Sequence, residues 1–268
     1  MYNSISCLIL STCHNSKLRW VQDVANSIEN NDIFDQKILA VDEFNGLKFP
    51  NRIKSIFEEK NWLVLVDNHM SRTKSMLHGI DESKSDLLFY SEDDVLLSLP
   101  QKEFILSHFN IELDGRKCGL VSLNLGGTNS KITNMGGNIN SPYEKGDLAF
   151  ARDTMIKKED DYFSFLRMEK YRNPWFFEFP GIFIDKNILK ELLYLANDKF
   201  KGYQIEMALT AAWFYGGFDK KYFKVSIAKN NFFDILADDP MRLHDESRLL
   251  TNLDKTQGAF IYGGNPAI

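Results

Sequence analysis

Residues 86–95, Asp-Leu-Leu-Phe-Tyr-Ser-Glu-Asp-Asp-Val, join an apolar run to three consecutive acids. The first half, Asp86 to Tyr90, has the composition of a buried strand. The acids Glu92, Asp93 and Asp94 stand at its end. Because adjacent carboxylates repel one another, this pattern indicates either a site that holds a divalent cation or a solvated acidic turn before a helix.

Three further apolar runs precede this stretch and alternate with amphipathic segments. Ile5 to Ser11, Lys37 to Val41 and Trp62 to Val66 have the length and composition of strands. Apolar residues between them recur at three- and four-residue steps: Trp20, Val21, Val24, Ala25 and Ile28, then Ile53, Ile56 and Phe57, then Thr73, Leu77 and Ile80. This alternation predicts an α/β fold with a mainly parallel, Rossmann-like sheet flanked by helices.

Acidic residues directly follow three of the four predicted strands. Asp42 and Glu43 follow the second strand, Asp67 follows the third, and the acids at 92–94 follow the fourth. The carboxyl ends of parallel strands share one edge of a sheet, where open α/β sheets bind their ligands. We therefore expect a ligand site along this edge.

A basic helix start lies just before the fourth strand. Arg72 and Lys74 fall in the first turn of the helix predicted over 72–80. Cations at this position oppose the helix dipole. An anionic ligand such as a phosphate would relieve that opposition, and so would a neighbouring acid such as Asp67, and both interpretations stay open.

The second half of the chain is less regular. Its predicted elements are a strand from Gly119 to Leu125, a polar loop from Gly126 to Asn140, helices from Lys186 to Phe200 and from Ile205 to Trp213, and a strand from Lys224 to Ala228. No internal repeat or low-complexity linker divides the sequence, so we expect one domain over residues 1–268.

Composition and charge exclude several classes of protein. A formal net charge of -5 argues against nucleic acid as the main partner. No apolar run approaches the roughly 18–20 residues of a membrane-spanning helix, so no transmembrane segment is expected. The three cysteines, Cys7, Cys13 and Cys118, match no zinc or redox spacing, which predicts free thiols and a cytoplasmic protein.

The order and spacing of these elements resemble the GT-A glycosyltransferases, specifically the family-two-like group that uses nucleotide-diphosphate sugars. In that family an Arg-bearing helix precedes a strand that ends in an Asp-x-Asp motif. Here Arg72 begins the helix, and Glu92-Asp93-Asp94 takes the place of the motif, with Glu as its first acid. The resemblance implies a nucleotide-sugar-binding half over residues 1–125 and an acceptor-side half over 126–268.

The resemblance also implies roles for individual residues toward the donor. Thr12 and His14 would line the nucleotide pocket, and Asp42 would meet the base or the ribose. Arg72 would approach the diphosphate or the sugar, and Asp93 would contact donor hydroxyls.

Metal binding and catalysis complete the set that the resemblance implies. Asp94, with Glu92 and His244, would hold Mn2+ or Mg2+ at the donor diphosphate. Glu206 would be the general base of an inverting transfer. Other interpretations stay open: Glu206 as a first-turn acid that stabilises its helix, and His244 as a packed or surface residue.

The sequence therefore predicts a metal-dependent glycosyltransferase that moves a hexose-type sugar from a nucleoside diphosphate to a hydroxyl of a glycan or another acceptor. Two alternatives remain: a sugar-nucleotidyltransferase, although residues 11–17 lack the glycines typical of that class, and a carbohydrate- or partner-binding protein without turnover. Dinucleotide-binding, P-loop and serine-hydrolase motifs are absent from the sequence.

Overall fold

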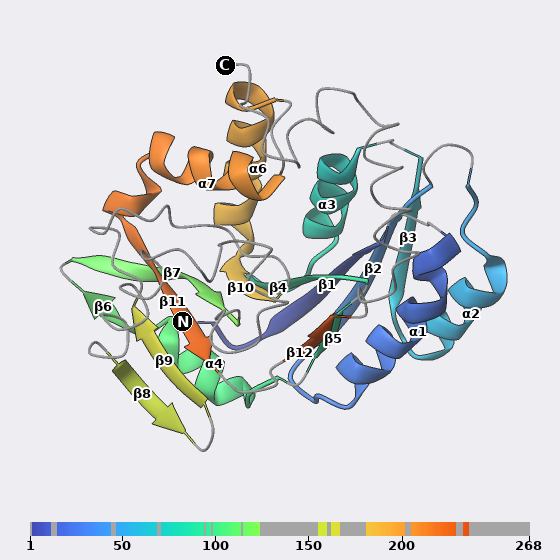
Figure 1. Cartoon of the computed structure of the whole chain (residues 1–268), viewed down its shortest axis with the longest axis horizontal. Helices are drawn as coiled ribbons and strands as arrows, with labels where there is room; N and C mark the ends of the chain where they lie inside the picture. The colour runs from blue at the N-terminus through green and yellow to red at the C-terminus, as the bar shows by residue number, and fades with distance from the viewer. Residues whose placement is uncertain are drawn as a thin grey trace.

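The computed structural model describes residues 2–11, 15–43, 47–68, 71–93, 95–97, 99–113, 115–123, 155–159, 162–166, 181–201, 205–228 and 233–235. In these ranges a central sheet carries helices on both faces (Figure 1). No helix in these ranges is long and apolar enough to cross a membrane.

The main sheet has ten strands, in the order β3-β2-β1-β4-β10-β7-β11-β9-β8, with β6 paired to β7. Its N-terminal strands are β1 (Ile5–Ser11), β2 (Gln36–Asp42), β3 (Leu63–Asp67) and β4 (Leu87–Glu92). The others are β6 (Glu112–Leu113), β7 (Arg116–Ser122), β8 (Met155–Glu159), β9 (Tyr162–Leu166), β10 (Ile182–Asp185) and β11 (Tyr222–Ala228). A second, two-stranded sheet pairs β5 (Val95–Leu97) with β12 (Phe233–Ile235).

The four N-terminal strands are mutually parallel, as predicted. Beyond β4 the sheet becomes mixed, because β10 lies antiparallel between β4 and β7, while β7 and β11 pair in parallel. The chain builds β2 and β3 on one side of β1 and then crosses to place β4 on the other. This reversal between β1 and β4 is the topological switch point at which open α/β sheets bind ligands.

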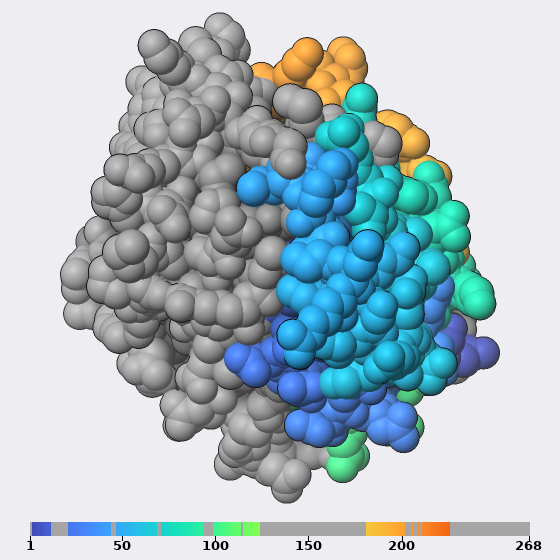
Figure 2. Space-filling view, turned by 90° about the vertical axis from the view of Figure 1, so that its right-hand side faces the viewer, coloured from blue at the N-terminus to red at the C-terminus, as the bar shows by residue number. Residues whose placement is uncertain are grey.

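Helices cover the two faces of the sheet and bury two apolar clusters. One cluster joins the sheet to α1 (Asn15–Glu29), α2 (Asn51–Glu59) and α4 (Lys102–His108). The other joins it to α3 (Arg72–Asp81), α6 (Lys186–Lys199) and α7 (Ile205–Tyr215). A 3-10 turn, η3 (Phe218–Lys220), follows α7. The space-filling view looks onto the outer side of the N-terminal half, with α2 and β3 in blue and cyan (Figure 2).

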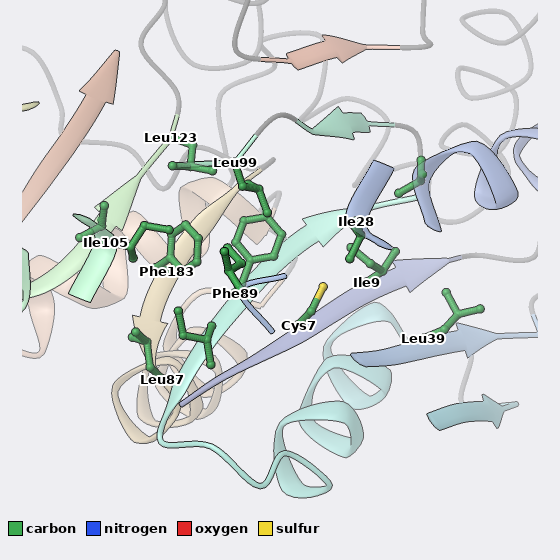
Figure 3. Close-up of a cluster of buried hydrophobic side chains, with 14 of the residues drawn as sticks. Cys7, Ile9, Ile28, Leu39, Leu87, Phe89, Leu99, Ile105, Leu123 and Phe183 are labelled. Carbon is green, nitrogen blue, oxygen red and sulfur yellow. The ribbon is translucent and has the colours of Figure 1, made fainter. Parts of the chain in front are cut away.

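Side-chain alternation explains why each central strand contributes to both clusters. In β1, Cys7 and Ile9 pack toward α1, whereas Leu8 and Leu10 pack toward α3 and α6. Figure 3 shows the α1-side cluster, in which the Phe89 side chain of β4 lies beside Phe183 of β10. The strands are apolar on both faces because helices cover both faces.

The approach of α3 to the sheet depends on Gly79. A Cβ atom at this position would collide with the buried side chain of Leu8 in β1. We expect Gly79→Ala to lower the free energy of unfolding by about 1–3 kcal/mol, because the core would be overpacked. Chemical denaturation measures this change, and Leu8→Val in the same chain should recover part of the loss. If Gly79→Ala instead raised the free energy of unfolding by about 1 kcal/mol, as helix propensity alone would do, the close contact between Gly79 and Leu8 would be contradicted.

Cys7 and Cys118 are buried free thiols, as predicted, while Cys13 lies outside the described residues. Burial raises the pKa of Cys7 well above its ordinary value and that of Cys118 to about 12. Thiolates are the reactive form, so neither thiol of a Cys13→Ser variant should react with a disulfide reagent at pH 8. In guanidinium chloride both should react, and rapid modification of either thiol in the folded Cys13→Ser variant would contradict this prediction.

Candidate functional site

The carboxyl ends of the parallel strands bring acids to one edge of the sheet. Asp42 at the end of β2 pairs in register with Asp67 at the end of β3. On the other side of β1, Glu92 of β4 pairs in register with Leu10. Asp42, Glu92 and Asp93 are largely buried. The predicted gathering of acids along this edge is therefore present in the structure.

Asp42 joins the end of β2 to the start of α3. Its Oδ2 accepts a hydrogen bond of 2.8 Å from the backbone N–H of Ser71. Ser71 is the N-cap of α3, and its Oγ in turn accepts from the backbone N–H of Lys74 at 3.4 Å. The carboxylate thus stabilises the positive end of the helix. The contact of Asp42 with a base or ribose stays a prediction.

Glu43 fixes the chain immediately after β2. Its carboxylate accepts a hydrogen bond from the backbone N–H of Phe49 at 3.0 Å and forms an ion pair with Lys48. The Lys48 ammonium holds the pKa of the Glu43 carboxyl below its usual range. Glu43 therefore binds the chain at residues 48 and 49.

Asp67 has a histidine as its partner. The Nδ1 atom of His78 lies 2.9 Å from each carboxylate oxygen of Asp67. This contact ties the middle of α3 to the end of β3. The sequence left open that Arg72 or Lys74 pairs with a nearby acid such as Asp67. Arg72 does pair with an acid, and that acid is Glu92.

Arg72 forms an ion pair with Glu92 across the edge of the sheet. Its Nη2 also donates to the hydroxyl of Tyr90 at 3.4 Å. The Glu92 side chain is 11% exposed and the Arg72 side chain 37% exposed, so the carboxylate is largely buried while the arginine side chain is partly open to solvent. The first-turn cation of α3 is thereby compensated by an acid, although the helix dipole opposes it.

The remaining predicted residues are incompletely described. Thr12, His14, Asp94 and His244 lie outside the described residues, and their roles stay predictions. Glu206 lies in the first turn of α7, as predicted.

A divalent cation at this edge would need several carboxylate or imidazole ligands close together. Within the described ranges no three His, Cys, Asp or Glu side chains gather as a metal-ligand group. Glu92, one of the predicted ligands, is bound by Arg72. The described part of the chain therefore does not by itself form a cation site.

Two residues of this site were not singled out from the sequence. Tyr90 is predicted from the sequence only as part of the buried strand, and Ser71 is not named among the predicted residues. The signal for Tyr90 was its position two residues before Glu92, since residues at i and i+2 of a strand share a face. The signal for Ser71 was a Ser immediately before a helical stripe.

A parallel half-sheet with its switch point between β1 and β4, and with polar groups at the carboxyl edge, is a Rossmann-like α/β arrangement. No protein-family model matches the sequence, and no curated protein matches it. Solved structures do match. TarS residues 1–349 from S. aureus is 12% identical, with a TM-score of 0.53 over 98% of this chain and 70% of that one.

A mannosyltransferase, PcManGT from Pyrobaculum calidifontis, crystallised with GDP-Man and Mn2+, is 9% identical, with a TM-score of 0.51 over 98% of this chain and 69% of that one. A cytidylyltransferase from Thermus thermophilus matches less closely, at a TM-score of 0.46 and 10% identity, over 93% of this chain and 99% of that one. The chain has a GT-A-type fold, which confirms the predicted architecture.

Proposed function

We propose that the chain is a glycosyltransferase that moves a sugar from a nucleoside-diphosphate donor to a hydroxyl of a glycan or another acceptor. The observation that carries the proposal is the arrangement of Arg72, Asp42 and Glu92 at the carboxyl edge of the parallel strands. A cation and the start of a helix beside the switch point suit a diphosphate.

In this proposal the donor lies along the ends of β1, β2 and β4. Thr12, His14 and Asp42 contact the nucleoside, Arg72 contacts the diphosphate, and Asp93 accepts hydrogen bonds from sugar hydroxyls. The near-complete burial of Asp93 at the end of β4 supports a defined orientation of its carboxylate.

A divalent cation, Mn2+ or Mg2+, belongs to the proposal as a group held by Asp94 and His244. When bound, it would neutralise negative charge on the departing diphosphate. The support is chemical: carboxylate and imidazole are suitable ligands for Mn2+, and Asp94 follows the buried pair of acids at the end of β4.

Glu206 is the proposed general base. Its carboxylate takes the proton of the acceptor hydroxyl while that oxygen forms a bond to the anomeric carbon, and the bond from this carbon to the diphosphate breaks. The reaction inverts the configuration of the anomeric carbon and releases the nucleoside diphosphate. The position of Glu206 in the first turn of α7 supports the proposal, since that helix belongs to the same face of the sheet as α3.

One observation favours a second candidate, a carbohydrate-binding protein without turnover. The ion pair between Arg72 and Glu92 compensates the first acid of the motif without a cation. Such a protein would bind glycan equally well in the presence of a chelator.

Product analysis tests the proposal. The purified chain is incubated with UDP-, GDP- and dTDP-linked sugars, with Mn2+ or with EDTA, and the released phosphates are separated by chromatography. Release of nucleoside diphosphate from one donor, in the presence of Mn2+ only, is the expected result. A parallel incubation contains a nucleoside triphosphate and a sugar phosphate, and release of pyrophosphate in it would indicate a nucleotidyltransferase instead. No release in either incubation would favour the binding protein.

A further inference from the structure

Strand β4 carries two polar side chains on the face that α3 covers. Tyr90 packs in the same apolar cluster as Met76 and Ile80 of α3, whereas Phe89 packs in the cluster on the opposite face. Glu92 follows Tyr90 by two residues and so continues the same row at the carboxyl end of the strand. Tyr90 and Glu92 thus form a polar pair beneath the start of α3.

The start of α3 is held independently of this pair. Asp42 accepts a hydrogen bond from the backbone N–H of Ser71 at 2.8 Å, and the Ser71 hydroxyl caps the first turn. These contacts hold the backbone just before Arg72 without any contribution from its side chain. The direction of the guanidinium is then decided by what that side chain meets.

The guanidinium of Arg72 meets both members of the pair. Its Nη2 donates to the Tyr90 hydroxyl at 3.4 Å, and an ion pair joins it to Glu92. Because guanidinium is planar and always charged, two partners on one row restrict its orientation. The Arg72 side chain still remains 37% exposed at the edge where the ends of β1 and β4 meet.

The length of Glu92 matters for this contact. A carboxylate one methylene shorter would end farther from Arg72, since both backbones are fixed by the sheet and by the helix cap. A longer first acid is therefore suited to reach the guanidinium.

We propose that Glu92 and Tyr90 are positioning residues that hold the Arg72 guanidinium in place for a diphosphate group, with Glu92 acting through Arg72 and not as a metal ligand. The inference rests on the proposed function, because the diphosphate is that of the proposed donor. It assigns the first acid of the Glu92-Asp93-Asp94 stretch to Arg72 and leaves cation binding to Asp94 and His244.

Calorimetric titration with inorganic pyrophosphate tests the inference, in buffer with EDTA and in buffer with Mg2+. We compare the wild type, Arg72→Ala, Glu92→Asp and the double variant in a double-mutant cycle. Asp replaces Glu92 because this substitution keeps the negative charge. Glu92→Asp should weaken pyrophosphate binding about tenfold with or without Mg2+ when Arg72 is present, and should have no effect when Arg72 is replaced. Tyr90→Phe, which removes only the hydroxyl, should weaken binding in the same direction.

Glu58→Asp is the matched control, because Glu58 forms an exposed i,i+4 ion pair with Lys54 on α2. It should bind pyrophosphate like the wild type. The inference is overturned if the wild type does not bind pyrophosphate, or if Glu92→Asp and Tyr90→Phe bind as tightly as the wild type. It is also overturned if the effect of Glu92→Asp requires Mg2+ and persists without Arg72, as expected of a metal ligand.

The failure of this inference is distinguishable from the failure of the proposed function. If the cycle behaves as expected but no sugar nucleotide is turned over, the glycosyltransferase proposal fails and the role of Glu92 stands. If turnover occurs but the effects of Arg72→Ala and Glu92→Asp on pyrophosphate binding are additive, the glycosyltransferase proposal is retained and Glu92 acts independently of Arg72.

Discussion

Replacing Glu206 by Gln is expected to lower kcat of sugar transfer by roughly 100- to 10,000-fold, because an amide cannot accept the proton of the acceptor hydroxyl. The affinity for nucleoside diphosphate should stay unchanged, since the proposed role of Glu206 concerns the acceptor alone. Steady-state kinetics with the donor found by product analysis, together with calorimetric titration of its nucleoside diphosphate, measures both quantities.

Glu191→Gln is the control for this prediction, because Glu191 is an exposed acid on the neighbouring helix α6. It should retain wild-type kcat. If Glu206 serves only as a first-turn acid of α7, Glu206→Gln would cost about 0.3–1 kcal/mol of stability and leave kcat unchanged. That outcome would remove Glu206 from the catalytic step.

Phe89→Ala is expected to lower the free energy of unfolding by about 3–5 kcal/mol, the usual cost of deleting a buried aromatic side chain. Phe89 is fully buried in β4, and its ring centroid lies 5.2 Å from that of Phe34 and 4.7 Å from that of Phe183. The side chain thus joins the parallel strands to antiparallel β10. Urea denaturation of the variant measures the loss.

Phe214→Ala provides the matched comparison, because Phe214 is 40% exposed at the end of α7. Its cost should stay within about 1 kcal/mol, as for most surface substitutions. If Phe89→Ala lowered the free energy of unfolding no more than Phe214→Ala, the described packing of Phe89 between β4 and β10 would be contradicted. The milder Phe89→Leu should fall between the two.

The parallel half of the fold could be predicted from the sequence because its signals are local. Ile5–Ser11 was predicted with its observed bounds, and the strands that end at Asp42, Asp67 and Glu92 were predicted within one or two residues. Helix coverage of both faces explains why β1 and β4 are buried along their whole length, whereas the edge strand β3 is apolar in sequence but partly exposed.

The C-terminal half was harder because its pairings are non-local. The strand predicted from Gly119 to Leu125 is β7, which begins earlier, at Arg116, and ends at Ser122. Strands β8 and β9 were not predicted, since short elements that depend on distant partners leave a weak periodic signal. A helix does follow the acids, as the acidic-turn interpretation expects, but it starts at Lys102, and Glu92 and Asp93 are buried rather than solvated. Cation binding by this stretch stays a prediction.

In the site, residue types could be predicted but pairings could not. Arg72 and Glu92 were both candidates, yet nothing in their spacing of twenty residues showed that they form an ion pair. That contact depends on where α3 lies on the sheet, which in turn depends on Gly79 and Asp42. Both pairings, Asp67 with His78 and Glu92 with Arg72, form only when the folded chain places α3 on the sheet.

A thermal-shift panel tests whether this edge of the sheet binds a nucleotide sugar with the help of a metal. It compares UDP, GDP, CMP and dTDP, each with Mn2+ and with EDTA, on the wild type and on Asp94→Ala. A ligand that binds only the native state stabilises it, by about 2.7 kcal/mol at a hundredfold excess over its dissociation constant. We expect one nucleotide to raise Tm of the wild type with Mn2+ and not with EDTA, and we expect Asp94→Ala to abolish the shift. If no nucleotide raises Tm of the wild type under either condition, the claim that this edge of the sheet binds a nucleotide sugar is contradicted.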